Sequence, residues 1–299
     1  MLSVLIPSYN DSKNLPIALT SALAVKSVSE IIVVNDNSTD DTEELIKEIK
    51  IEFDQIKYIK NKNNIGSGFS FIKALEFSSN PYIIMLNSDD FFIPNAIDSL
   101  LEFSQINNLD VAYGKMAIRK KSGIHNFKHP GYKKNTYING RNELKDLLIY
   151  DMYTPSFGSI IKKKSLDSFY NFKYYQDLQK SYGGYFKAHD YDLFINLAKR
   201  KKKFGFLNET VCVWCPKNES QSGNSYFDSG ESSYESSFLF NRYFRNEKFD
   251  TSSLKLILKR INEKLSYKKN YHSKLNEKLS THYHLFLENV NKTLHNIKS

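Results

Sequence analysis

Apolar runs of strand length alternate with segments of helical periodicity over about the first hundred residues. The run EIIVVN is continuous and β-branched, as a strand buried on both faces of a parallel sheet requires. Ser38, with Asp41 three residues later, resembles a capping box that opens a helix. The alternation predicts an α/β fold with a doubly wound, mostly parallel sheet. The expected strands are Ser3–Pro7, Glu30–Asn35, Gln55–Lys60 and Tyr82–Leu86, and the expected helices are Asn14–Val25, Ser38–Lys50, Ser70–Ser79 and Pro94–Gln105.

The pattern is less regular beyond this region. Residues 216–237 are rich in Ser, Asn and Gly, which predicts a mobile loop. From residue 238 onward apolar residues recur at helical spacing, so a C-terminal helical extension is expected. Two further strands (Asp110–Ile118 and Ser156–Lys162) and two further helices (Glu143–Asp151 and Asp190–Lys199) are expected between these regions.

The net charge of +9 is unevenly distributed along the chain. Residues 251–299 contain ten Lys or Arg and three Glu, a balance of 10 − 3 = +7, which leaves +2 for the rest. A basic segment of this kind predicts an anionic partner: membrane lipid, nucleic acid or a phosphorylated substrate. No run of 18 or more apolar residues is present, so no membrane-spanning helix is expected. Two cysteines exclude a disulfide scaffold.

Polar side chains follow three of the expected strands, in Pro7–Asp11, Asn35–Ser38 and Asn87–Asp90. Ligands of open parallel sheets bind beyond the carboxyl ends of the strands, so these residues form a candidate site. Each segment taken alone is also typical of an ordinary turn or helix cap. The adjacent acids Asp89 and Asp90 suit Mg²⁺ or Mn²⁺ together with phosphate oxygens. No P-loop motif is present and no G-x-G-x-x-G follows the first strand, so neither a P-loop NTPase nor a Rossmann dehydrogenase is expected.

Five segments in this order and spacing resemble a family 2 glycosyltransferase of the GT-A fold: LSVLIPSYN, IIVVNDNSTDDT, KNNIGSGFSFIKAL, YIIMLNSDDFF and HDYDLFINLAKR. The resemblance covers roughly residues 1–225. It implies a nucleotide-sugar donor, Mn²⁺ or Mg²⁺ as cofactor, and inversion at the anomeric carbon. It also implies a nucleotide-sugar-binding half over 1–110 and a half that binds the acceptor and carries the catalytic base over 111–237, followed by the basic extension 238–299.

The resemblance also implies roles for the strand-end residues. Asp36 would accept hydrogen bonds from the nucleobase or ribose, and Asp89 would bind the metal. Asn87 stands where the family carries the first acid of its Asp-x-Asp motif; its amide still offers an oxygen ligand. The residues expected to contact the donor are Pro7, Ser8, Tyr9, Asp36, Asn64, Gly66, Asn87, Ser88, Asp90 and Lys217.

Asp190 takes the position of the family's catalytic base, which removes the proton of the acceptor hydroxyl. His189 stands where the family usually has an acid; it either contacts the acceptor or replaces a structural acid. An Arg-x-His segment that often reaches the diphosphate is replaced here by Cys215 and Lys217, of which Lys217 can still supply a positive charge.

These observations predict an inverting transferase that moves a hexose or N-acetylhexosamine from a UDP-sugar to a hydroxyl of a glycan, which a lipid carrier can hold. The expected setting is bacterial assembly of surface polysaccharide, lipooligosaccharide or glycoprotein glycans, in the cytoplasm. The basic extension either packs on the domain or forms a dimer, or it contacts the inner face of the membrane through 251–299. Nucleic acid is not an expected partner, and the oligomeric state is left open. The alternatives are a GDP- or dTDP-sugar donor, or a non-catalytic module of the same fold that recruits a membrane glycan-assembly complex.

Overall fold

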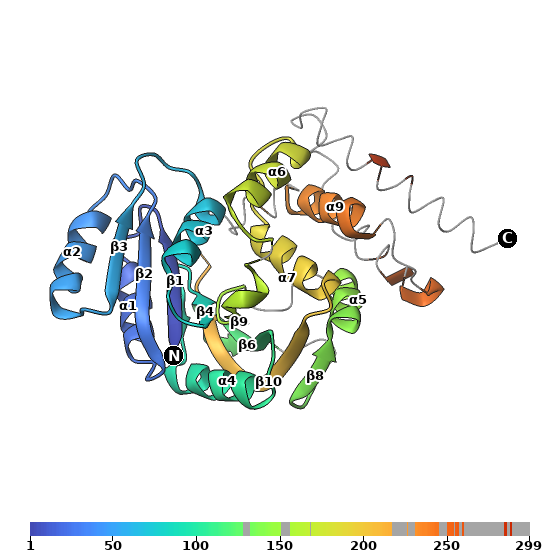
Figure 1. The fold of residues 1–299 in the computed structure, drawn as a ribbon, viewed down its shortest axis with the longest axis horizontal. Helices are drawn as coiled ribbons and strands as arrows, with labels where there is room; N and C mark the ends of the chain where they lie inside the picture. Colours follow the sequence, from blue (N-terminus) through green and yellow to red (C-terminus); the bar gives the residue numbers. More distant parts are fainter. Residues whose placement is uncertain are drawn as a thin grey trace. The chain divides into compact units, whose positions relative to one another are not determined.

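The computed structural model describes residues 1–127, 132–150, 156–167, 169–216, 226, 231–244, 250–253, 255–256, 259, 284–285 and 288 (Figure 1). The elements in chain order are β1 (Leu2–Ser8), α1 (Leu15–Leu23), β2 (Val28–Asn35), α2 (Thr42–Glu52), β3 (Ile56–Lys60), α3 (Ser67–Phe77), β4 (Tyr82–Met85), β5 (Phe91–Phe92), α4 (Pro94–Ile106), β6 (Val111–Lys120), β7 (Gly123–Asn126), β8 (Thr136–Asn139), α5 (Gly140–Tyr150), β9 (Ile160–Lys162), a short 3₁₀ turn (Lys163–Ser165), α6 (Phe172–Tyr182), α7 (His189–Lys199), β10 (Lys203–Trp214) and α9 (Glu231–Phe244).

The chain divides into two compact units. The first unit contains the sheet and consists of Met1–Gly140, Tyr153–Tyr175 and Arg200–Cys215. The second unit consists of Arg141–Met152, Gln176–Lys199 and Pro216–Ser299.

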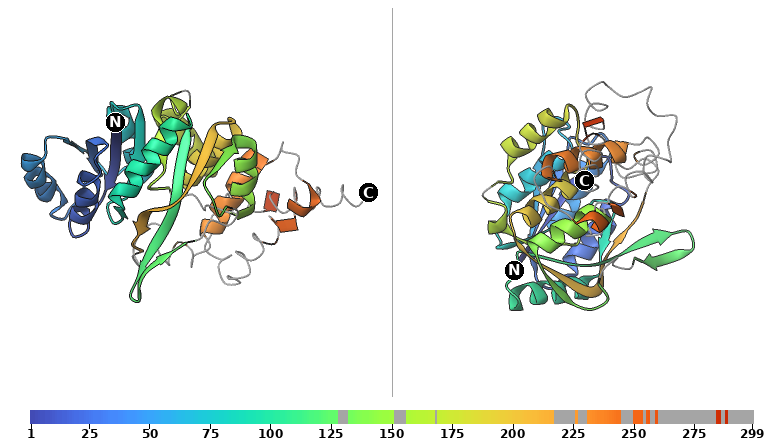
Figure 2. Two further views of the ribbon diagram at one scale, coloured as in Figure 1. Left: turned by 90° about the horizontal axis from the view of Figure 1, so that it is seen from below. Right: turned by 90° about the vertical axis from the view of Figure 1, so that its right-hand side faces the viewer.

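The sheet of the first unit has the strand order β3-β2-β1-β4-β9-β6-β10-β5, with β7 paired to β6 and β8 to β10. Strands β3, β2, β1 and β4 are mutually parallel, which confirms the α/β fold expected from the alternation. Strand β9 inserts antiparallel between β4 and β6, while β6 and β10 pair in parallel. Strands β6 and β7 form a hairpin that extends away from the sheet (Figure 2).

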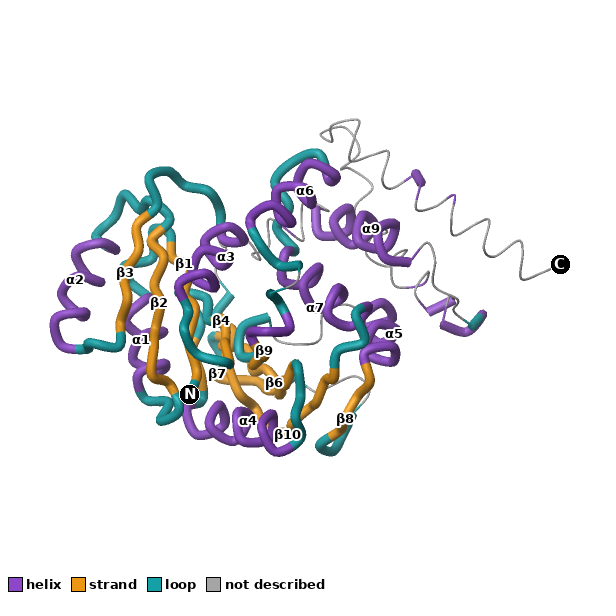
Figure 3. The backbone as a smooth tube through the Cα atoms, viewed as in Figure 1, coloured by secondary structure: helices purple, strands orange, loops and turns teal. Residues whose placement is uncertain are grey.

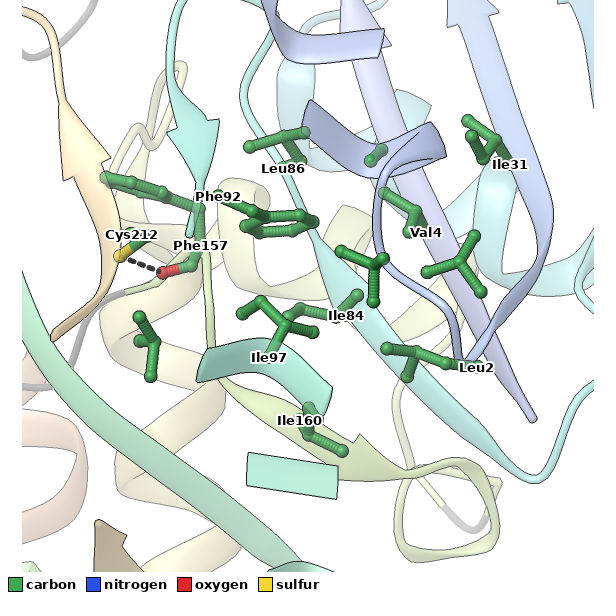
Figure 4. Packing of buried hydrophobic residues seen from close by; sticks show 14 of the residues in the cluster. Leu2, Val4, Ile31, Ile84, Leu86, Phe92, Ile97, Phe157, Ile160 and Cys212 are labelled. Atoms are coloured by element: carbon green, nitrogen blue, oxygen red, sulfur yellow. Dashed lines mark hydrogen bonds between the residues drawn. The ribbon is translucent and has the colours of Figure 1, made fainter. Parts of the chain in front are cut away.

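Both faces of the parallel strands β1, β2 and β4 are buried. Leu2, Val4 and Ile6 of β1 pack in one core with apolar residues of α1 and α4, together with Ile84, Ile97 and Phe157 (Figure 4). The alternate residue Leu5 points to the other face and is equally buried, and α3 contacts β1 and β2. Full burial of one such side chain stabilises a fold by about 1.5–3 kcal/mol. The two-sided burial explains why these strands are continuous apolar runs.

Two sequence expectations about local structure were wrong. Ser38 does not cap α2, which begins at Thr42; instead the Ser38 hydroxyl accepts a hydrogen bond from the Asn10 amide at 3.0 Å. The Asp40 carboxylate instead accepts hydrogen bonds from the amide and the hydroxyl of Thr42, the first residue of α2. Residues 231–237 were expected to belong to a mobile loop, but α9 begins at Glu231. The rest of that loop, except Tyr226, lies outside the described residues.

Buried Glu30 joins four segments at the amino end of the parallel strands. Its carboxylate accepts hydrogen bonds from the Ser3 hydroxyl at 2.5 Å, from the amide and hydroxyl of Ser79 at 2.9 and 2.8 Å, and from the Lys57 ammonium. Burial by itself raises the pKa of Glu30, but these hydrogen bonds outweigh it and lower the pKa to about 2. The ionised carboxylate is therefore preferred by the folded protein.

We predict that Glu30→Gln lowers the free energy of unfolding at pH 7 by about 2 kcal/mol, because a charged acceptor of several hydrogen bonds is lost. A lowered carboxyl pKa stabilises the fold fully above about pH 4.5 and loses that contribution as the pH falls towards 2. Urea unfolding at pH 7, 4.5 and 3 measures this, and the variant should lack the wild-type decline. The exposed residue Glu48 on α2 provides the control: Glu48→Gln should change stability by less than about 0.5 kcal/mol.

Candidate active site

The loops that follow β1, β2 and β3 meet at one edge of the sheet (Figure 3). The β1 loop brings Pro7, Ser8 and Tyr9 to this edge; Ser8 is buried, Pro7 half-buried, and Tyr9 is 48% exposed. Asn10 adopts a φ of 50° there, which asparagine tolerates better than most residues. The exposed ring of Tyr9 gives this edge an aromatic surface.

Asp36, at the end of β2, organises the loop after β3. Its Oδ1 accepts hydrogen bonds from the Asn61 side chain at 2.8 Å and the Ile65 amide at 2.9 Å, and its Oδ2 accepts from the Gly66 amide at 2.7 Å. Gly66 has a φ of 89°, which a residue with a Cβ rarely adopts. The exposed side chain of Asn64 also accepts from the Gly66 amide, at 3.1 Å. Asp36 therefore holds the loop over residues 61–66 in one conformation.

A second buried carboxylate joins the β1 loop to the β4 loop. Asp11, which the sequence analysis did not single out, accepts hydrogen bonds from the Ser88 hydroxyl at 2.7 Å and the Asn14 amide group at 2.6 Å. Its backbone amide donates to the Thr42 hydroxyl at 3.1 Å. The sequence signal was present, because Asp11 closes the polar run after β1, but its partner lies 77 residues away.

Asp89 and Asp90 occupy different environments. Asp90 is buried, and its carboxylate accepts hydrogen bonds from the Asn87 side chain and the Cys215 backbone amide, each at 2.8 Å. It thereby ties the end of β4 to the end of β10. Asp89 is half-buried and lies beside it. Of the two acids, Asp89 is the more exposed to solvent.

The donor set around Asp89 fits a hard divalent cation. Mg²⁺ and Mn²⁺ bind through one or two carboxylates and complete their shell with phosphate oxygens and water. Asp89 supplies the carboxylate, and the Asn87 side-chain oxygen lies in the same short loop. Among the described residues, no group of three or more His, Cys, Asp or Glu side chains is arranged to hold a metal without such additional ligands.

Asp190 lies in the second unit, in the first turn of α7. Its carboxylate is half-buried, and Oδ1 accepts a hydrogen bond from the Tyr191 amide at 2.8 Å. The preceding His189 is buried, which lowers the pKa of its imidazole, although the neighbouring Asp190 carboxylate opposes the shift. His189 is therefore neutral at pH 7. The structure thus collects the predicted donor residues in the first unit and Asp190 in the second, while Lys217 lies outside the described residues.

Further residues of the second unit were not found from the sequence. Asp192 is completely buried and accepts a hydrogen bond from the Tyr243 hydroxyl at 2.5 Å. Glu235 of α9 is also completely buried and accepts from the backbone amides of Lys187 and Ala188. The partners of these two acids are 47 to 51 residues distant, so the local sequence does not reveal them.

Comparison with known proteins places the chain among glycosyltransferases. GalNAc(5)-diNAcBac-PP-undecaprenol beta-1,3-glucosyltransferase of Campylobacter jejuni is 27% identical over 209 residues, which cover 67% of this chain and 60% of that protein. The uncharacterized glycosyltransferase MG025 homolog of Mycoplasma pneumoniae is 34% identical over 100 residues, covering 32% of this chain and 33% of that one. The chain thus spans a third of one relative and less than two thirds of the other.

The crystal structure of S. aureus TarS 1-349 in complex with UDP-GlcNAc has a TM-score of 0.70 with this chain at 18% identity, covering 97% of this chain and 81% of that one. At this identity the likeness shows the fold, which confirms the GT-A architecture. The family model for Glycosyl transferase family 2 matches residues 3–169, more than half of the chain. The resemblance found in the sequence is therefore confirmed, and the chain belongs to glycosyltransferase family 2.

Proposed function

We propose that this protein is an inverting glycosyltransferase that moves a hexose or N-acetylhexosamine from a UDP-sugar to a hydroxyl of a glycan acceptor. The observation that carries the proposal is the edge of the first unit, where the β1 loop, the 61–66 loop held by Asp36, and Asp89 meet. The TarS structure that shares this fold contains UDP-GlcNAc, and the Campylobacter relative is named a glucosyltransferase acting on an undecaprenol-linked glycan. Both support a UDP-sugar and a lipid-linked acceptor.

The donor side of the proposed reaction uses the residues of that edge. Tyr9 offers its exposed ring to the nucleobase, while Pro7 and Ser8 form the adjoining backbone. Asp36 acts by fixing the loop of Asn64 and Gly66, and its oxygens can accept further hydrogen bonds from the nucleoside. Asn87, Ser88 and Asp90 shape the loop that carries Asp89. Lys217 is proposed to face the diphosphate.

Asp89 would hold Mn²⁺ or Mg²⁺, which when bound offsets the negative charge of the leaving diphosphate. Asp190 would accept the proton of the acceptor hydroxyl while that oxygen forms its bond to the anomeric carbon. The bond from the anomeric carbon to the diphosphate breaks on the opposite face, and its electron pair leaves with UDP. Attack opposite the leaving group inverts the configuration, so no covalent sugar–enzyme intermediate is required.

We predict that Asp190→Asn lowers turnover by about 10²–10⁴-fold, because general-base catalysis is lost, while UDP binding measured by calorimetry stays unchanged.

The identity of the donor is tested by measuring nucleotide release from a panel of UDP-, GDP- and dTDP-sugars with Mn²⁺ and then with EDTA. Release from UDP-sugars alone supports the proposed donor; release from a GDP- or dTDP-sugar favours the alternative donor. Binding of UDP without release from any donor, with or without a glycan acceptor, would favour the non-catalytic module.

The two adjacent acids should separate in a matched pair of variants. Asp89→Asn should weaken Mn²⁺-dependent UDP binding by about tenfold or more with stability unchanged, since one charged ligand is worth about 1.5–3 kcal/mol. Asp90→Asn should lower the free energy of unfolding by about 1–3 kcal/mol, because its buried oxygens accept from Asn87 and Cys215. Calorimetry and urea unfolding of both variants measure this. The reverse pattern would exchange the two assignments.

We also propose that residues 251–299 contact an anionic membrane surface, on the basis of their +7 charge. Most of this segment lies outside the described residues, and no helix among the residues that are described is long and apolar enough to cross a bilayer. Deleting 251–299 should reduce co-sedimentation with phosphatidylglycerol vesicles several-fold at 0.1 M salt. Equal sedimentation of the full chain and the deletion variant would overturn the membrane contact.

A further inference from the structure

Glu235 on α9 makes a buried three-point contact within the second unit. Its Oε1 accepts a hydrogen bond from the Lys187 amide at 2.6 Å, and its Oε2 accepts from the Ala188 amide at 2.9 Å and the Tyr226 hydroxyl at 2.6 Å. The side chain is 0% exposed. A carboxylate buried to this extent is unfavourable unless each of its oxygens is satisfied, and here both are.

The two amides that Glu235 binds immediately precede α7. The first amides of a helix have no partner within it, so a side chain must supply one. Ala188 is the residue whose carbonyl accepts the first α7 hydrogen bond, from the Asp192 amide at 3.1 Å. Glu235 therefore acts as a cap supplied by a different helix, and it fixes the backbone two residues before Asp190.

Packing of α7 on α9 does not depend on this contact. The Tyr243 hydroxyl of α9 donates a hydrogen bond to the Asp192 carboxylate of α7 at 2.5 Å, and Glu235 takes no part in it. The rings of Tyr182, Phe186 and Phe238 pack together with centroids 5.2 to 5.6 Å apart. A buried hydrogen bond thus joins α9 to α7, while the aromatic cluster joins α9 to α6 and to the segment that precedes α7.

We propose that Glu235 is a positioning residue, which holds the N-terminus of α7 so that the Asp190 carboxylate keeps one orientation toward the acceptor hydroxyl. The inference rests on the proposed function of Asp190 as the general base. Because turnover is sensitive to displacements of about 1 Å at the reacting groups, loosening of this turn should lower the rate by about tenfold or more.

The surroundings of Glu235 give the contact a pH dependence. Burial raises the pKa of Glu235 to about 7, against the hydrogen bonds from Lys187, Tyr226 and Ala188, and the nearby Glu231 carboxylate raises it further. Tyr182 of α6 faces Glu235, Asp190 faces Tyr226, and the Lys187 ammonium bonds Glu231 at 2.7 Å. Below about pH 7 one Glu235 oxygen carries a proton, so it accepts hydrogen bonds from the Lys187 and Ala188 amides less well and holds the start of α7 less firmly. Turnover should therefore rise as the pH increases through about 7.

Stability should change in the opposite direction. The pKa of Glu235 is higher in the folded chain than the ordinary value of 4.5. Ionisation therefore disfavours the folded state progressively as the pH rises from about 4.5 to 7, and the full penalty remains above that range. A residue that served only to stabilise the fold would not lower the free energy of unfolding in this way, whereas a residue that positions Asp190 can do so.

The test compares Glu235→Gln with Tyr243→Phe, which removes the buried hydrogen bonds that join the Tyr243 hydroxyl to Asp192 and Asn196 of α7. Glu235→Gln should lower the rate of UDP release from UDP-GlcNAc or UDP-glucose by about tenfold or more at pH 8, with the Kd for UDP unchanged. It should also remove the rise in rate near pH 7 and speed hydrogen exchange of the Lys187 and Ala188 amides by about tenfold or more. Tyr243→Phe should lower stability but leave turnover and the exchange of these amides as in wild type.

Two further variants protect the test. Tyr226→Phe removes one of the three hydrogen bonds to Glu235 and keeps the charge. It should cause a smaller fall in the rate of UDP release, and it provides the test if Glu235→Gln does not fold. Glu231→Gln should move the midpoint of the pH profile downward and leave its plateau unchanged. Wild-type turnover and amide exchange in both Glu235→Gln and Tyr226→Phe would overturn the positioning role. A fully active Asp190→Asn would instead overturn the assignment of Asp190 as the base, even if the Lys187 and Ala188 amides still exchanged faster in Glu235→Gln.

Discussion

The buried carboxylate of Asp36 is the constraint on which the nucleotide side of this structure depends. A parallel strand ends with polar backbone groups that the sheet no longer pairs, and the loops that follow must satisfy them. The Asp36 carboxylate does this by accepting hydrogen bonds from two backbone amides, those of Ile65 and Gly66, in the loop that follows the neighbouring strand β3. The loop then has one permitted path, which includes the positive φ of Gly66. A preformed loop of this kind binds a ligand without first losing conformational entropy.

The same device recurs at the other strand ends and at α7. Asp11 joins the loops of β1 and β4, and Asp90 joins the ends of β4 and β10. Glu235 binds the amides that precede α7. In each case a buried acid satisfies a donor of a segment distant in sequence: a backbone amide for Asp36, Asp90 and Glu235, and the Ser88 hydroxyl for Asp11. Asp89 and Asp190, the two acids proposed to act on ligands, are half-buried.

Hydrophobic pattern predicted the parallel half of the fold because each of its signals is local. A strand buried on both faces is a continuous apolar run, and β1, β2 and β4 all show it. Strand β10 was missed, since the polar residues near Thr210, where its register on β6 shifts, interrupt the apolar pattern. Ser38 was misassigned as a cap because a local motif was weighed without its long-range partner, Asn10. The candidate site followed the same division: the strand-end residues were identifiable by position and by resemblance, but the distant partner of Asp11 and the buried Glu235 were not.

Burial therefore distinguishes between acids that sequence treats as equivalent. Asp89 and Asp90 are neighbours with the same chemistry, and a motif assigns either of them to the metal. Desolvating a carboxylate is unfavourable, so a buried acid is retained only where protein donors replace the lost water, and those donors then compete with any ligand for its lone pairs. Asp90 and Asp36 meet this condition through backbone amides, whereas Asp89 keeps contact with solvent. The same argument separates Asp192, committed to Tyr243, from Asp190 two residues earlier on the same helix. In both pairs the buried donors distinguish the acid that is committed to the protein from the acid for which we propose a role toward a ligand.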